Sequence, residues 1–166
     1  GRLADGRLVD LRVIDGTIGQ ISDVADRAAN PRPDSSVGAV HHLNGWLLLP
    51  SLAEPHAHLD KALTAELVPN PAGDLMGAID AWVAASAAGR ITYDGIVERA
   101  IAAMDLLLVH GVTAVRTHVN VLESIGATAV KAVLEAASAF EGSLDVQVVA
   151  LCGSPLTGRE GAGTRA

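Results

Sequence analysis

The chain opens with alternating apolar and polar residues and changes to helical spacing in its middle. Residues 8–22 read LVDLRVIDGTIGQIS, two β-rich runs joined by Asp15-Gly16. This dipeptide favours the tight turn of a β-hairpin, so we expect two antiparallel strands here. Residues 26–39 are rich in Pro, Asn, Asp, Ser and Gly, which indicates a surface loop.

Two further short apolar runs follow that loop, at residues 40–43 and 46–49, before Pro50 interrupts the pattern. Each has the length and composition of a short strand. We therefore expect residues 1–50 to form a β layer of their own.

From residue 51 onward, helical and strand-like segments alternate. The expected elements are helices within 74–89, 92–111 and 124–142 and strands at 112–121 and 144–151. Asp74 and Thr92 stand where N-caps are expected, and Gly89 and Gly111 stand just past the ends of the same helices. Strands separated by helices imply βαβ units and a parallel sheet, and hence the α/β class.

A parallel sheet must be covered on both faces or closed into a barrel. A (β/α)8 barrel of the triosephosphate isomerase type takes ~250 residues. After Leu151 the chain offers only the glycine-rich segment CGSPLTGREGAGTRA. We therefore expect residues 51–166 to be a truncated barrel with about its first three strands, and the sequence to be an N-terminal piece of a longer protein.

Composition limits the partners that fit the chain. Hydrophobic residues make up 49% and charged residues 19%, as expected of a folded protein. The net charge of −7 argues against nucleic acid and against anionic membranes, because both attract basic surfaces. Cys152 is the single cysteine, so no internal disulfide is possible, and no uninterrupted run of about 18 apolar residues occurs. These features favour a cytoplasmic protein with a small-molecule partner.

The segment LLLPSLAEPHAHLDKALTA places His56 and His58 one residue apart after an apolar run. In a strand, residues i and i+2 point to the same face, so the two imidazoles project together. Neutral imidazole is the commonest metal ligand, and such a pair can supply two corners of a divalent-metal site. A hydrogen-bonded pair of histidines in a turn is the alternative for so short a pattern.

Three stretches together resemble a known family. EPHAHLDKALTA, ITYDGIVERAIAAMDLLLVHGVTAVRTHVNV and LDVQVVAL are similar to the cytosine deaminase-like branch of the amidohydrolase superfamily. In that superfamily a β-sandwich precedes a barrel whose first strand carries the His-x-His ligands. The resemblance therefore implies a small β-sandwich module, incomplete, at residues 1–50 and a partial (β/α)8 barrel at 51–166.

The resemblance assigns roles only at matching positions. His56 and His58 match the two first-strand metal ligands. Leu75 matches a pocket-lining leucine, with burial in a helix core as the alternative. His118, at the end of the second barrel strand, could support the ligands or simply pack.

Other matches are incomplete. Asp60 could orient a ligand histidine, as carboxylates around metal sites do, or cap a turn. Cys152-Gly153-Ser154 stands where the branch has a substrate-binding glutamine, which puts a pyrimidine substrate in doubt. The resemblance places the remaining metal ligands and the proton-handling carboxylate beyond Ala166.

The chemistry that the resemblance implies is hydrolysis of a non-peptide C–N bond, by deamination or amide hydrolysis. Zinc or iron, with manganese as a further option, would lower the pKa of a bound water towards ~7. The substrate would be a pyrimidine-like ring or a cyclic or linear amide, and the full-length protein a homo-oligomer. A truncated remnant without catalysis and a metal-binding module without turnover are the alternatives for the chain by itself.

Overall fold

The computed structural model describes residues 1–29, 38–122, 125–153 and 159. The chain divides into two compact units, Gly1–Pro50 and Ser51–Ala166.

The first unit is built on an antiparallel hairpin. Strand β1 (Val9–Ile14) pairs with β2 (Thr17–Asp23), and Asp15 and Gly16 turn the chain with φ angles of 49° and 75°. Positive φ at both central residues is typical of the hairpin turns that Asp-Gly favours. The hairpin prediction is therefore confirmed.

The rest of the first unit departs from the sequence expectation. A short helix, α1 (Val24–Ala29), occupies part of the segment expected to be a loop. The strands expected at 40–43 and 46–49 are not formed, and an isolated bridge from Arg2 to Leu47 is what this segment contributes. Short apolar runs form strands when a neighbouring strand pairs with them, and among the described residues Leu47 alone in these runs has such a partner.

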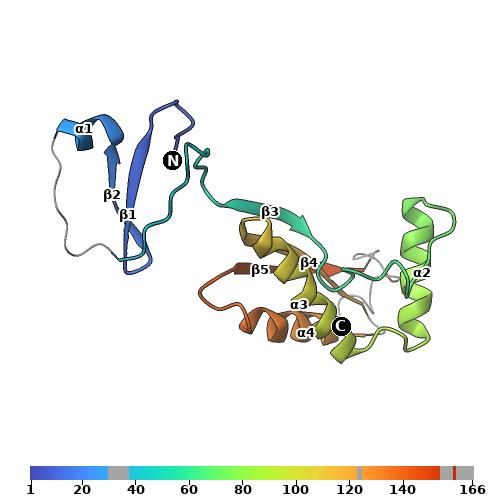
Figure 1. Ribbon diagram of the computed structural model, residues 1–166. Coiled ribbons are helices and arrows are strands. Elements are labelled where there is room, and N and C mark those ends of the chain that lie inside the picture. The colour runs from blue at the N-terminus through green and yellow to red at the C-terminus, as the bar shows by residue number, and fades with distance from the viewer. Residues whose placement is uncertain (30–37, 123–124, 154–158, 160–166) are drawn as a thin grey trace. The chain divides into compact units, whose positions relative to one another are not determined.

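The second unit is a mixed α/β structure. Strand β3 (Leu52–Ala57) is followed by helices α2 (Leu75–Ala87) and α3 (Tyr93–Val109), strand β4 (Val112–Val121), helix α4 (Thr128–Ser138) and strand β5 (Asp145–Cys152). The three strands form one parallel sheet in the order β3-β4-β5 (Figure 1). The expected helices, the strands after them and the parallel pairing are confirmed, whereas closure into a barrel remains a prediction.

The helix ends follow the expected capping. Asp74 accepts a hydrogen bond from the Gly77 backbone N–H at 2.6 Å, and Thr92 accepts one from Gly95 at 3.2 Å. These bonds satisfy N–H groups that have no partner within the helix. At the other end of α2, Gly89 has a φ of 68°, the left-handed conformation that terminates helices and suits glycine.

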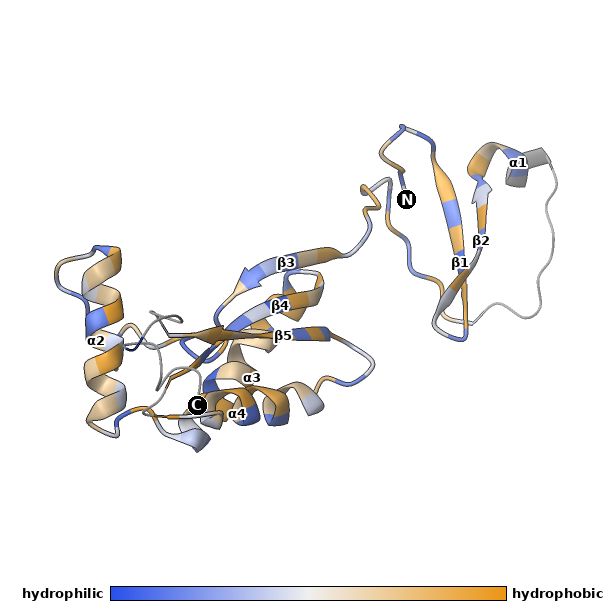
Figure 2. Cartoon of the chain, turned by 180° about the vertical axis from the view of Figure 1, so that it is seen from behind, coloured by the Kyte–Doolittle hydropathy of each residue, from blue (hydrophilic) through white to orange (hydrophobic). Residues whose placement is uncertain are grey.

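Helices α3 and α4 cover one face of the sheet (Figure 2). On β4, Val115, Thr117 and Val119 point into this interface and are 0–3% exposed. Their contacts on the helices are apolar, with Met104 of α3 and Val133 of α4 both fully buried. The alternate residues of β4 therefore lie on the opposite, open face of the sheet.

Pairing in the sheet is regular between β4 and β5 and irregular between β3 and β4. The first pair runs continuously from Ala114–Asp145 to Val121–Cys152. In β3 the register shifts between Glu54 and Ala57, where Pro55 has no N–H to donate. The carboxyl ends of β3 and β4 nevertheless meet at one edge of the sheet.

No helix within the described part of the chain is long and apolar enough to cross a membrane.

Candidate functional site

Three histidines meet at the carboxyl ends of β3 and β4. The His56 ring stacks on His118, with ring centroids 4.2 Å apart and an interplanar angle of 28°. His58 lies edge-on to His56 at 5.3 Å and 6.0 Å from His118. His56 belongs to β3, His58 follows that strand directly, and His118 comes from β4. The predicted projection of His56 and His58 together is therefore found, with His118 added from the neighbouring strand.

One ring nitrogen of His58 is hydrogen-bonded to the backbone. Its Nδ1 lies 2.8 Å from the carbonyl oxygen of His118, and the protonated Nδ1 is the group that can donate to a carbonyl. This bond fixes the tautomer, so that Nε2 carries the free lone pair. Histidines that bind metals are usually held in this way by a backbone carbonyl or a carboxylate.

The turn after His58 is bonded to β4 at two buried points. The Leu59 N–H donates to Thr117 Oγ1 at 2.9 Å, and the Asn120 N–H donates to Asp60 Oδ2 at 3.0 Å. The side chains of Thr117 and Asp60 are both 0% exposed. Because both bonds lie within three residues of His58, they fix the position of its backbone against β4.

Lys61 extends this set of contacts. Its ammonium donates to Asp60 at 3.1 Å and to Asn120 Oδ1 at 3.0 Å. The same nitrogen lies 5.7 Å from the centre of the Trp82 ring, a cation–π distance. Lys61 therefore pairs with the buried Asp60 side chain and also contacts helix α2.

The surroundings of His118 disfavour its charged form. Desolvation of the ring, and then the charges of His56 and His58, lower the pKa of His118 below its ordinary value, against a raising effect from a backbone hydrogen bond with Ala57. Its Nδ1 is buried and has no hydrogen-bond partner among the residues that the structure describes. The lowered pKa of His118 favours its neutral ring, the form in which histidine binds metals.

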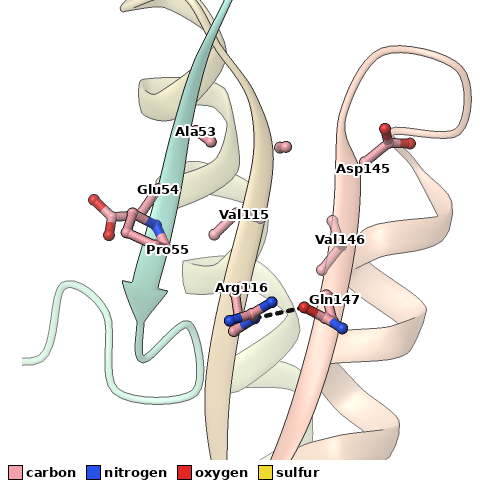
Figure 3. A pocket seen from close by; sticks show the side chains of 9 residues that line it. Ala53, Glu54, Pro55, Val115, Arg116, Asp145, Val146 and Gln147 are labelled. Carbon is pink, nitrogen blue, oxygen red and sulfur yellow. Dashed lines mark hydrogen bonds between the residues drawn. The ribbon is translucent and has the colours of Figure 1, made fainter.

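Polar side chains precede the histidines by two positions on both β3 and β4. Arg116 precedes His118 by two residues and donates from Nε to Gln147 Oε1 of β5 at 2.5 Å (Figure 3). These two side chains and Glu54 line a shallow hollow of about 480 Å³. Glu54 also accepts a hydrogen bond from the His56 backbone N–H at 3.0 Å.

The other sequence-predicted residues lie as follows. Asp60 accepts hydrogen bonds from Lys61 and from the Asn120 backbone N–H. These are the contacts expected of a residue that caps a turn. A role in orienting a ligand histidine stays a prediction. Leu75 is the first residue of α2 and is 74% exposed, so it is not a core residue.

Within the described residues, no group of three or more His, Cys, Asp or Glu side chains is arranged to hold a metal. His56 and His58 thus remain two predicted ligands of an incomplete set.

Four residues that contact the turn after His58, or each other beside it, were not predicted from the sequence: Lys61, Trp82, Thr117 and Asn120. Two of them, Thr117 and Asn120, lie in VRTHVNV, in which four of the seven residues are polar, so polarity alone did not single them out. Thr117 and Asn120 lie on opposite faces of β4 by their parity, and both bond to the turn after His58.

No protein-family model and no curated protein sequence matches the chain. Among solved structures, it is similar to 5-methylcytosine deaminase from Klebsiella pneumoniae. With 5-fluorocytosine bound, that enzyme gives a TM-score of 0.71 at 30% identity over 90% of this chain and 34% of the enzyme. With phosphonocytosine bound, the values are 0.70, 29%, 89% and 34%.

A second enzyme shares the fold. N-isopropylammelide isopropylaminohydrolase from Burkholderia multivorans gives a TM-score of 0.69 at 22% identity, over 98% of this chain and 39% of that one. The chain thus spans about a third of the length of the deaminase structures it matches. The resemblance stated from the sequence motifs is confirmed: the chain is similar to enzymes of the amidohydrolase superfamily, in its cytosine deaminase-like branch.

Proposed function

We propose that the full-length protein is a metal-dependent hydrolase of non-peptide C–N bonds, either a cytosine deaminase-like deaminase or an amidohydrolase. One observation carries the proposal. His56 and His58 project from the carboxyl end of β3, with His58 Nδ1 bound to a backbone carbonyl, in a chain similar to a 5-methylcytosine deaminase. Active sites of parallel barrels are built at the carboxyl ends of the strands.

In this proposal His56 and His58 are two ligands of a divalent metal, with zinc, iron and manganese all suited to histidine and carboxylate donors. When bound, such a metal supplies an activated water at neutral pH. The free Nε2 of His58 is available for this purpose because its Nδ1 is engaged. His118 supports the pair through its carbonyl oxygen and its stacked ring.

The proposed site needs further groups. We place the remaining ligands, and the carboxylate that moves the proton to the leaving amine, beyond Ala166. Residues 51–166 are then the first part of a barrel and residues 1–50 an incomplete β-sandwich module. The substrate proposed is a small pyrimidine-like ring or an amide, since one similar enzyme is a 5-methylcytosine deaminase and another an isopropylaminohydrolase.

The test is ammonia or amine release by the purified full-length protein after metal reconstitution. We would offer cytosine, 5-methylcytosine and an N-alkylated amino-triazine, and compare wild type with His58→Asn and His110→Asn. His110 is the matched control, an exposed histidine whose Nδ1 also bonds to a backbone carbonyl, that of Leu106 at 2.7 Å.

We expect turnover of at least one compound, lost in His58→Asn and retained in His110→Asn. Equal turnover in wild type and His58→Asn would show that the histidine pair is not the catalytic site. An absence of turnover on all three compounds, in a protein that has taken up metal, would remove the deaminase assignment.

A further inference from the structure

The end of β4 is bonded to two consecutive residues of the turn after His58. Asp60 Oδ2 accepts a hydrogen bond from the Asn120 backbone N–H at 3.0 Å, and Lys61 Nζ donates to the Asn120 side-chain oxygen at 3.0 Å. Lys61 also donates to Asp60 at 3.1 Å. The backbone and the side chain of Asn120 are therefore both bonded to one turn, which fixes the rotation of the turn against β4 as well as its distance.

Lys61 Nζ lies between these two acceptors and a buried ring. Trp82 of α2 is 5% exposed, and the centre of its ring is 5.7 Å from Nζ. The Asp60 side chain is 0% exposed, so water does not replace the lysine. Without the Nζ donors, the Asn120 N–H would be the one partner left to this carboxyl group among the described residues. Removing one partner of a buried polar group is costly, so the turn would move until Asp60 found another.

The hydrogen bond that fixes the His58 ring lies within this group of contacts. His58 Nδ1 is 2.8 Å from the His118 carbonyl oxygen. His118 precedes Asn120 by two residues and His58 precedes Lys61 by three, so the bond and the lysine belong to one short contact between the turn and β4. Such bonds have N···O distances of about 2.7–3.2 Å and weaken steeply with misalignment. A small displacement of the turn would therefore release Nδ1, and either ring nitrogen could then carry the proton.

We propose that Lys61 is a positioning residue of the histidine site. By donating to Asp60 and to Asn120 it holds the turn against β4, keeps the proton of His58 on Nδ1 and leaves Nε2 free. The effect on the His58 ring depends on contacts within the chain, whereas the effect on a metal rests on the proposed function. Groups that hold a ligand histidine in place contribute about 10- to 100-fold to metal affinity.

The two lysines of the sequence supply the test and its control. Lys61→Met retains the length of the side chain and removes its N–H donors, whereas Lys61→Arg retains donors for both acceptors. Lys131→Met, at an exposed position of α4, is the matched control. All variants are made in the full-length protein, and urea unfolding measures the global stability of each.

Nitrogen NMR of the metal-free protein, labelled at its histidine ring nitrogens, shows which nitrogen of His58 carries the proton. The spectra are recorded at about pH 8, where unperturbed imidazoles are neutral, and His58→Asn identifies the His58 signals. We expect the proton on Nδ1 in wild type, Lys61→Arg and Lys131→Met, and a mixture of the two tautomers in Lys61→Met. A lysine that only stabilises the fold would leave these signals unchanged.

Zinc affinity, measured by competition with a chelator, is the second readout. We expect Lys61→Met to bind zinc at least about 10-fold more weakly than wild type, with Lys61→Arg and Lys131→Met within about 3-fold of it.

Four results separate the positioning role from the proposed function. An unchanged His58 tautomer in Lys61→Met would overturn the proposal, even if zinc binding fell in step with global stability, and so would equal changes in Lys131→Met. An altered tautomer with unchanged zinc affinity would overturn the role of Lys61 in metal binding. A wild-type protein that binds no zinc, together with an altered tautomer in Lys61→Met, would overturn the proposed function and support the positioning of His58 by Lys61.

Discussion

Thr117→Val should loosen the turn that carries His58 while changing the volume of the side chain very little. Valine has the shape of threonine but no hydroxyl, so the bond from the Leu59 N–H to Thr117 Oγ1, now 2.9 Å long, would be lost. Thr117 is 0% exposed and Leu59 is 2% exposed, so water cannot replace the acceptor. The backbone N–H of Leu59 would stay buried without a partner.

The cost of that orphaned donor is about 1–3 kcal/mol in the free energy of unfolding. Thr117→Ser keeps the hydroxyl and loses one buried methyl group, which costs about 0.8 kcal/mol. For a folding unit of about 150–250 residues, each 1 kcal/mol lowers Tm by about 2–4 °C. Valine should therefore lower Tm by roughly 4–8 °C for a loss of ~2 kcal/mol, and serine by about half of that or less.

Urea unfolding and hydrogen exchange of the Leu59 amide measure this prediction at two levels. We expect the Leu59 amide to lose protection in Thr117→Val and to keep it in Thr117→Ser. A valine variant as stable as wild type, with Leu59 still protected, would refute the argument that the hydroxyl holds the turn to β4.

Three further changes test the packing and the helix contacts. Met104→Ala should lower the free energy of unfolding by about 2–5 kcal/mol, since Met104 is 0% exposed in the core. A loss under about 1 kcal/mol by urea unfolding would mean that neighbouring side chains fill the space left by Met104. Thr92→Ala should cost about 1 kcal/mol by the same measurement because α3 loses its N-cap, whereas Thr92→Ser should restore most of it. Tyr93 is the one tyrosine of the sequence, and its hydroxyl donates to Glu135 at 2.6 Å, which raises the pKa of Tyr93 above 10.0. The contact is thus stabilising below pH 10 and is lost as pH rises through the higher pKa; ultraviolet titration should show the raised midpoint, and Glu135→Ala should return it towards the ordinary value.

Local signals explain what could be predicted from the sequence. Asp15-Gly16 specifies its hairpin, and Thr92 and Gly111 mark the limits of α3 within a residue or two, because turn and cap chemistry depends on a few adjacent residues. The strands at 112–121 and 144–151 were recognisable as β-branched runs between helices. The His-x-His pair was recognisable because strand geometry alone brings i and i+2 together.

The contacts that could not be predicted from the sequence join residues far apart in the chain. Asp60 meets Asn120 across 60 residues of sequence, and Leu59 meets Thr117 across 58. No local pattern specifies which polar group of β4 faces the turn, since register between strands is set by the packed structure. The prediction of strands at 40–43 and 46–49 was wrong for a related reason: a strand needs a partner strand, and its own sequence does not show whether one is present.

Metal content per chain shows whether His56 and His58 bind a metal. The full-length protein, reconstituted with zinc and analysed by elemental analysis, would be compared with His56→Asn, His58→Asn and the control His110→Asn. We expect about one bound metal in wild type and in the His110 variant, and loss of that metal in both the His56 and the His58 variants. The same metal content in all four proteins would show that neither histidine is a metal ligand and would return His56 and His58 to a structural role.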